Sequence, residues 1–106
     1  MEKELFKLQS DVCKTMANPK RLEIIYTLKD GERSVSEIVS ATTLAPANVS
    51  QHLAVLRSSG VVKMRRLGTS IFYKIANPKI IKACALMRQV LLDEMKEKEK
   101  LLKRLK

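Results

Sequence analysis

The sequence predicts one mainly helical domain with a single small β-hairpin, in the order helix, helix, short helix, helix, hairpin, long helix. Apolar residues recur every three or four positions through most of the chain, and two segments rich in Val, Ile, Phe and Tyr replace that spacing over residues 61–76. The chain has 106 residues, 45% of them hydrophobic, so residues 1–106 are expected to form one domain. The hydrophobic core of so short a chain is more stable when the chain packs one face against a second copy of itself.

The first two helices follow from apolar spacing and from a capping sequence. Four apolar residues mark a helix over about residues 3–17: Leu5, Leu8, Val12 and Met16. Asn18 and Pro19 then supply an N-cap and a proline at the first helical position. The second helix is expected to end near Gly31, and its inward residues share the same spacing: Leu22, Ile25 and Leu28.

Two shorter helices are predicted next. Residues 34–37, Ser-Val-Ser-Glu, have the form of a capping box, so a short helix is expected to begin there. Its apolar positions are Ile38, Val39 and Leu44. Pro46 begins the following helix and Gly60 ends it. A short helix, a brief turn and a second helix make a helix-turn-helix motif.

A hairpin and a long helix complete the chain. Residues 61–67 and 70–76 are predicted strands, and Gly68 and Thr69 form the turn between them. Asn77 and Pro78 repeat the earlier cap and begin a helix over about residues 78–104, whose end is expected to fray or project. Its apolar stripe comprises Ile80, Ile81, Cys84, Met87, Leu91, Met95, Leu102 and Leu105. A hairpin directly after a helix-turn-helix predicts a winged helix-turn-helix fold, α-α-α-α-β-β-α.

Positive charge is concentrated in the middle of the chain. The formal net charge is +10, yet residues 38–92 contain no Asp or Glu. The basic residues of that segment are Arg57, Lys63, Arg65, Arg66, Lys74, Lys79, Lys82 and Arg88. An acid-free basic segment is typical of nucleic-acid binding, and the alternative is an ordinary solvated surface.

The helix that begins at Pro46 has an unusual outer face. At 100° per residue, Val49, Leu53 and Leu56 cluster toward the core. The opposite side carries Ala47, Gln51, Ala54 and Ser58, flanked by Asn48, Ser50 and Arg57. A solvated helix face usually carries Lys and Glu, whereas these small residues allow close approach to the major groove. Gln51 is expected to bond adenine, Asn48 and Ser50 bases or phosphates, and Arg57 phosphate.

Two further groups are predicted to contact DNA. His52, the only histidine, lies near the apolar side of its helix, which predicts a half-buried packing residue or phosphate contact rather than a metal ligand. The hairpin supplies Lys63, Arg65, Arg66, Thr69 and Ser70. Such a basic wing can follow the DNA backbone or enter the minor groove, and the alternative is charge that keeps a strand edge soluble.

These motifs resemble the ArsR-type (ArsR/SmtB) winged-helix repressors along nearly the whole chain. The matching segments are residues 18–22, 49–53, 56–57, 60–62 and 68–73. The resemblance implies a homodimer built from the first and last helices, bound to an inverted-repeat operator and released by an effector. Local departures are Thr43, where the family's turn often has Gly, and Ala45, where a Ser cap is usual.

The resemblance also bears on the effector. Metal-sensing members place Cys where this chain has Ser36, Ile38 and Ser40, or His and Asp in the last helix, which has no His here, so no metal site is expected. The cysteine positions of persulfide-sensing members correspond to Tyr26 and Leu92.

The chain's own cysteines, Cys13 and Cys84, fall on the two expected dimerisation helices. They are either small buried packing residues or a thiol sensor for an oxidant, a persulfide or arsenite. A disulfide or a shared thiophilic ligand requires that they approach one another.

The predicted function is therefore a sequence-specific transcriptional repressor. The alternatives are an effector-independent architectural protein that binds DNA or RNA, and an interaction or membrane-surface module that uses the tail over residues 96–106. An enzyme is not expected, because the chain has one histidine, no phosphate-binding glycine loop and no evident acid pair. Neither a signal peptide nor an 18-residue apolar stretch is present, so a cytoplasmic location is predicted.

Overall fold

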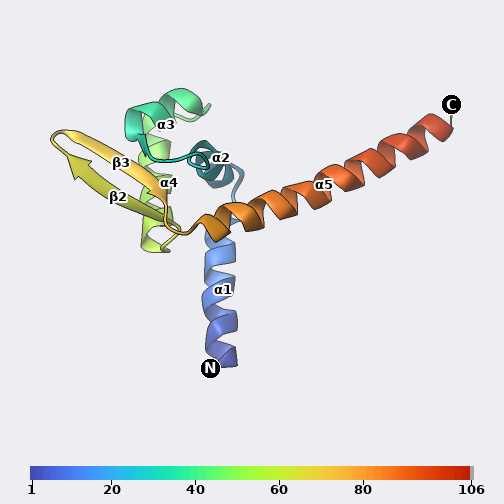
Figure 1. Ribbon diagram of the computed structural model, residues 1–106, viewed down its shortest axis with the longest axis horizontal. Helices are drawn as coiled ribbons and strands as arrows, with labels where there is room; N and C mark the ends of the chain where they lie inside the picture. The colour runs from blue at the N-terminus through green and yellow to red at the C-terminus, as the bar shows by residue number, and fades with distance from the viewer. Residues whose placement is uncertain (106) are drawn as a thin grey trace.

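The computed structural model describes residues 1–105, and Lys106, the last residue of the predicted tail, lies outside them. The elements, in chain order, are α1 (Glu2–Met16), α2 (Pro19–Thr27), β1 (Arg33–Ser34), α3 (Val35–Ala41), α4 (Pro46–Ser58), β2 (Val62–Leu67), β3 (Ser70–Ile75) and α5 (Pro78–Arg104). The predicted order of helices and hairpin is confirmed (Figure 1). The short strand β1 is an addition. The two-residue strand was missed because it is too short to show a period.

The core lies where α2, α3 and α4 meet the base of the hairpin. Its fully buried residues are Ile24, Ile25, Leu28, Ile38, Val49, Leu53, Leu56 and Val61. The prediction that Leu22 faces inward is wrong, because its side chain is 38% exposed while Ile24 is buried. At 100° per residue, Leu22 points roughly 110° away from the mean direction of Ile24, Ile25 and Leu28.

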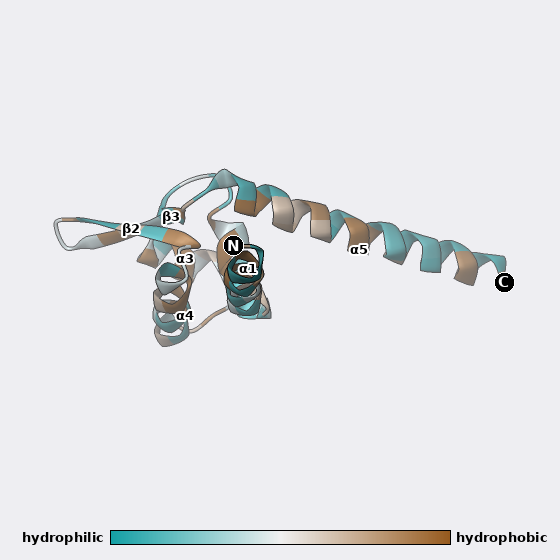
Figure 2. Ribbon diagram, turned by 90° about the horizontal axis from the view of Figure 1, so that it is seen from below, coloured by the Kyte–Doolittle hydropathy of each residue, from teal (hydrophilic) through white to brown (hydrophobic). Residues whose placement is uncertain are grey.

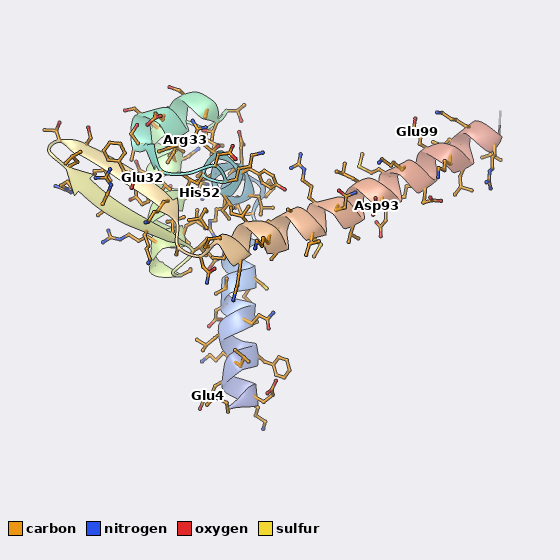
Figure 3. All side chains as sticks on the ribbon, viewed as in Figure 1. Glu4, Glu32, Arg33, His52, Asp93 and Glu99 are labelled. Atoms are coloured by element: carbon orange, nitrogen blue, oxygen red, sulfur yellow. The ribbon has the colours of Figure 1, made fainter. Side chains whose placement is uncertain are left out.

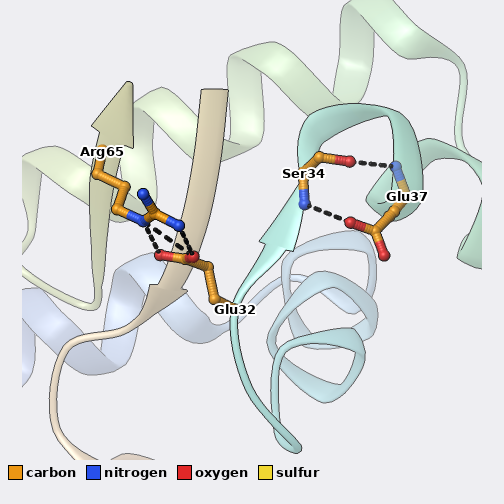
Figure 4. A network of polar contacts seen from close by, with 4 residues as sticks. All are labelled: Glu32, Ser34, Glu37 and Arg65. Atoms are coloured by element: carbon orange, nitrogen blue, oxygen red, sulfur yellow. Dashed lines mark hydrogen bonds and ion pairs between the residues drawn. The ribbon is translucent and has the colours of Figure 1, made fainter. Parts of the chain in front are cut away.

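Helix caps form where the sequence predicts them. The Asn18 Oδ1 accepts hydrogen bonds from the backbone N–H groups of Lys20 and Arg21, at 2.9 and 3.2 Å. Ser34 and Glu37 form a complete capping box, in which each side chain accepts from the other's backbone N–H (Figure 4). These caps satisfy backbone donors that would otherwise lack partners at the helix starts.

The turn before α4 is held by a different contact. Ala45 provides no side-chain cap. Instead, a carboxylate oxygen of Glu23 on α2 accepts from the backbone N–H of Thr43 at 2.9 Å and from its hydroxyl at 3.2 Å. Glu23 therefore ties the turn of the helix-turn-helix to α2.

The three strands form an antiparallel sheet in the order β1-β3-β2. In the hairpin, Val62 pairs with Ile75 and Leu67 pairs with Ser70, and Gly68 adopts a φ of 62° in the two-residue turn. On the other edge of β3, Arg33 pairs with Tyr73. The sheet thus joins the base of the hairpin to the start of α3.

Helices α1 and α5 project from this body in different directions (Figure 1). No residue of Glu2–Met16 or of Pro78–Arg104 is buried. Large apolar side chains remain uncovered on both helices, including Phe6 at 63% exposure and Met87 at 64%, and hydrophobic residues recur along α5 (Figure 2). These faces have no partner within the single chain.

Of the two alternatives expected for the end of α5, fraying or projection, the structure shows projection, and the helix continues to Arg104. Two ion pairs, each between residues one helical turn apart, stabilise this end of α5: Glu97–Lys100 and Glu99–Lys103, each at 3.5 Å. The expected projection is seen, since residues 93–105 are all exposed. No helix within residues 1–105 is both long and apolar enough to cross a membrane.

Candidate nucleic-acid interface

Helix α4 has one buried side and one open side. Val49, Leu53 and Leu56 are at most 1% exposed and pack in the core. The opposite side presents four exposed residues, here called the polar ridge: Ala47, Gln51, Ala54 and Ser58. The flanking Ser50 and Arg57 are exposed, and Asn48 is half-buried. The structure thus places the ridge outward, as the helical spacing predicts.

The chemistry of the polar ridge suits close contact with another molecule. Two of its four side chains are single methyl groups, which allow the helix backbone to approach a surface closely. Within residues 1–105, the side-chain amide of Gln51 has no intramolecular hydrogen bond, so its donors and acceptor are free to read a base edge. The Ser58 hydroxyl donates to the carbonyl of Val55 at 2.9 Å and keeps its acceptor lone pairs.

A polar network holds the flank of α4 that carries His52 against α1 and α2. Arg21 Nε donates to His52 Nδ1 at 3.2 Å, and Arg21 Nη1 donates to the carbonyl of Thr15 at 3.0 Å. The hydroxyls of Thr15 and Ser59 share a hydrogen bond of 2.8 Å. His52 is half-buried, as predicted. Burial, followed by the charges of Arg21 and Lys20, holds the pKa of His52 below its ordinary value of 6.5.

The basic residues of the wing, the hairpin of β2 and β3, differ in whether they are paired with an acidic residue. Lys63, Arg66, Thr69 and Ser70 are exposed, and neither Lys63 nor Arg66 has an acidic partner within 4 Å in residues 1–105. Arg65 is different, because its guanidinium contacts both carboxylate oxygens of Glu32 at 2.7–2.9 Å (Figure 4). It also lies 4.9 Å from the centre of the Phe72 ring. In this chain, Arg65 anchors the wing to the segment before β1.

Among the acidic residues, Glu23 contacts the turn before α4 and Glu32 contacts Arg65 of the wing, whereas others lie on the projecting helices. Glu4 lies on the outer half of α1, and Asp93 and Glu99 lie on the projecting part of α5 (Figure 3). Because Glu32 is paired with Arg65, it does not leave an uncompensated negative charge beside the wing. The field around α4 and the hairpin therefore remains positive, which favours a polyanion.

Three residues that organise this site were not predicted from the sequence: Arg21, Glu23 and Glu32. Each contacts a residue at least 20 positions away, namely His52, Thr43 and Arg65. No local spacing links such partners, and only the fold brings them together. For Glu32, pairing across the sheet places Arg65 opposite Phe72, which in turn pairs with Ser34 close to Glu32.

The two cysteines differ in environment. Both are free thiols, Cys13 exposed on α1 and Cys84 half-buried on α5. Cys13 is therefore not a packing residue of the single chain's core, and whether it packs in a dimer stays a prediction. Burial raises the pKa of the Cys84 thiol, which lowers its thiolate fraction at neutral pH. Within residues 1–105, no group of three or more His, Cys, Asp or Glu residues is placed to hold a metal ion.

Comparison with known proteins gives one family. The profile described as "Bacterial regulatory protein, arsR family" matches residues 18–64. An uncharacterized HTH-type transcriptional regulator of Mycobacterium tuberculosis, Rv0081, is 44% identical over 93 residues, which cover 86% of this chain and 82% of the relative. Its crystal structure covers 89% of this chain and 95% of its own, with a TM-score of 0.77.

Two further structures are similar. The homodimeric winged helix-turn-helix DNA-binding domain of Mb0332 from Mycobacterium bovis is 38% identical, with a TM-score of 0.77 over 91% of this chain and 88% of that domain. The transcriptional repressor BigR from Xylella fastidiosa is 30% identical, with a TM-score of 0.73 over 85% of this chain and 95% of its own. The predicted winged helix-turn-helix fold is thereby confirmed.

The Glu32–Arg65 pair predicts a defined response to acid. Hydrogen bonds from Arg65, followed by its charge, hold the pKa of Glu32 below its ordinary value of 4.5. A lowered carboxyl pKa in the folded state means that the pair stabilises the fold above pH 4.5 and loses this effect as pH falls through the lower, folded pKa. Arg65→Met is expected to raise the pKa of Glu32 toward 4.5, measured by NMR titration of its carboxyl carbon.

Arg66→Met is the matched control, because Arg66 is the next residue in β2 and has no acidic partner within residues 1–105. It is expected to leave the pKa of Glu32 nearly unchanged. Equal titration curves for Glu32 in the two variants would show that the ion pair is absent in solution.

Proposed function

The chain belongs to the arsR family of bacterial regulatory proteins, and from this premise we propose that it is a sequence-specific DNA-binding repressor that acts as a homodimer on an inverted-repeat operator. The family consists of transcription regulators, and the proposal assigns no catalytic residue and no metal. DNA is the proposed partner, and the cytoplasm is the proposed location.

The polar ridge is the observation that carries this proposal. Its residues are exposed, while the opposite side of α4 is fully buried. In helix-turn-helix proteins the second helix of the motif enters the major groove, and α4 is that helix here. We assign base contact to Gln51, close approach to Ala47 and Ala54, and base or phosphate contacts to Asn48 and Ser50. Arg57 and His52 contact phosphate.

The wing supplies the second part of the interface. Lys63 and Arg66 provide cations without acidic partners in residues 1–105, and Thr69 and Ser70 lie at the exposed turn. We assign these four residues to the DNA backbone or the minor groove. Arg65 contacts DNA only if it exchanges Glu32 for a phosphate, so its first role is to hold the wing in place.

The uncovered helices support the homodimer. α1 and α5 bury no residue in the single chain, and both carry large exposed apolar side chains. Contact between the same faces of two copies would cover them through one symmetric interface. We therefore propose that residues 1–106 form one winged helix-turn-helix unit, with dimerisation helices at about residues 3–17 and 78–104. A two-fold dimer places two ridges on half-sites about 34–36 Å apart or a multiple of this spacing, which explains an inverted repeat.

The proposed effector acts on thiols. Cys13 is exposed on α1, and Cys84 is half-buried on α5, so both lie on the helices assigned to the dimer. An oxidant, a persulfide or arsenite that reacts there could change the dimer geometry and release DNA. Cys13 is the more accessible thiol, whereas the raised pKa of Cys84 disfavours its reactive thiolate.

Substitutions at Gln51 and Arg66 are expected to have different effects on DNA binding. Gln51→Ala should weaken operator binding by about 1–3 kcal/mol and relax specificity at one base pair. Arg66→Ala should weaken binding to all duplexes alike and reduce the slope of log affinity against log salt by about one. Mobility-shift titrations on the protein's own promoter region and on random duplex, at several salt concentrations, measure both effects.

Two outcomes would contradict the assignments. Unchanged operator affinity in Gln51→Ala would show that α4 presents another face to the groove. Equal affinity of the parent protein for promoter and random duplex at physiological salt would favour the effector-independent architectural protein, since specific binders exceed non-specific binding by about 10³ or more.

The thiol proposal predicts that Cys13→Ser loses the response to its effector. Operator release by peroxide, persulfide and arsenite would be followed by fluorescence anisotropy for the parent, Cys13→Ser and Cys84→Ser. Cys13→Ser is expected to respond least, because it removes the exposed thiol while nearly keeping side-chain size. If both variants respond as the parent does, the effector does not act through these cysteines.

A further inference from the structure

The contact between Arg21 and His52 determines which nitrogen of the imidazole carries the proton. Arg21 Nε lies 3.2 Å from His52 Nδ1. An arginine guanidinium is always protonated and offers only donors, so Nδ1 must act as the acceptor. A neutral imidazole with an accepting Nδ1 carries its single proton on Nε2. The neighbouring arginine therefore selects one of the two tautomers.

The imidazole is also kept neutral at this position. Burial lowers the pKa of His52, and the positive charges of Arg21 and Lys20 on α2 lower it further. Protonation would place a second N–H against the Arg21 donor and break the hydrogen bond. The neutral form with Nε2–H is thus the species near neutral pH.

The Nε2–H group has no internal acceptor. Within residues 1–105, His52 makes one side-chain hydrogen bond, the one through Nδ1, and its Nε2 is not among the enclosed polar atoms that lack a partner. Nε2 is therefore not fully enclosed in the half-buried side chain. His52 lies one turn after Asn48 on the same flank of α4, between the buried side and the polar ridge, so a phosphate that contacts Asn48 lies next to His52 along the helix.

Arg21 is itself held by a second contact. Its Nη1 donates to the carbonyl of Thr15 in the last turn of α1, at 3.0 Å. The backbone N–H of Arg21 donates to the Asn18 cap at 3.2 Å. With both ends of the residue fixed, the direction of the Nε–H bond toward His52 is set by the junction of α1 and α2.

We infer that Arg21 is a positioning residue for DNA binding: it holds His52 as the Nε2–H tautomer and directs that N–H toward a phosphate of the duplex. The phosphate contact rests on the proposed function, whereas the tautomer is a property of the protein alone. A neutral imidazole in the other tautomer would present a lone pair to the phosphate and repel it. Arg21 therefore makes Nε2 of His52 a hydrogen-bond donor by holding Nδ1 as the acceptor.

The tautomer is measured directly by NMR. His52 is the only histidine, so a long-range ¹H–¹⁵N spectrum of the labelled full chain near pH 8 contains one imidazole. The parent is expected to show an unprotonated Nδ1 and a protonated Nε2. Arg21→Met, which keeps an apolar stem of similar length but no donor, is expected to show nitrogen shifts averaged between the two tautomers. Lys20→Met, which removes a neighbouring charge without touching the hydrogen bond, should keep the parent pattern.

A DNA-binding cycle tests whether the tautomer matters for function. Arg21→Met should weaken operator binding about tenfold more than Lys20→Met, because a hydrogen bond to a charged phosphate is lost. In a His52→Ala background, Arg21→Met and Lys20→Met should have equal effects, since Arg21 acts through His52. In the parent complex, exchange of the Nε2–H proton with solvent should slow when DNA is added, a measurement that needs no variant.

The outcomes separate this inference from the proposed function. A proton on Nδ1 in the parent, or an unchanged tautomer in Arg21→Met, would overturn the positioning role whether or not the protein binds DNA. Equal losses of affinity in Arg21→Met and Lys20→Met with His52 present would overturn the phosphate contact. A parent with the expected tautomer and no affinity for any duplex would refute the proposed function and the phosphate contact, while the role of Arg21 in fixing the tautomer would stand.

Discussion

Val49, Leu53 and Leu56 hold α4 in one rotational position, and every feature of the interface depends on that contact. The three side chains are at most 1% exposed and lie among residues of α2, α3 and the hairpin base. Burial of one such side chain is worth about 1.5–3 kcal/mol. Together the three approach the total stability of a small domain, about 5–15 kcal/mol. Rotating α4 to hide the polar ridge would expose all three and bury the Gln51 amide, so the ridge stays outward.

Polar contacts then determine what surrounds the ridge. On one flank, Arg21 joins the end of α1 to His52, so the helix assigned to the dimer is connected to the helix assigned to DNA. Beyond the other end of α4, Glu32 and Arg65 fasten the wing to the segment before β1. Arg21 and Thr15 therefore form a direct contact path between α1 and α4. This gives the proposed cysteine chemistry on α1 a physical route to the DNA-binding residues.

Much of the fold could be predicted from the sequence, because its signals are local. The spacing of Val49, Leu53 and Leu56 defines the buried side of α4, and Ser34 and Glu37 define the start of α3. Leu22 was misplaced because a nine-residue helix leaves its inward direction poorly determined by spacing. The pairs Arg21–His52 and Glu32–Arg65 were out of reach, since their members lie 31 and 33 residues apart and become neighbours only in the folded chain.

The most direct test of the central claim is a set of intermolecular NOEs between the labelled protein and its operator duplex. The buried underside of α4 predicts contacts from the methyl groups of Ala47 and Ala54, and from the side-chain amide of Gln51, to major-groove protons of the bases. Contacts from the outer surface of α5 to the bases, with none from these three residues, would contradict the account.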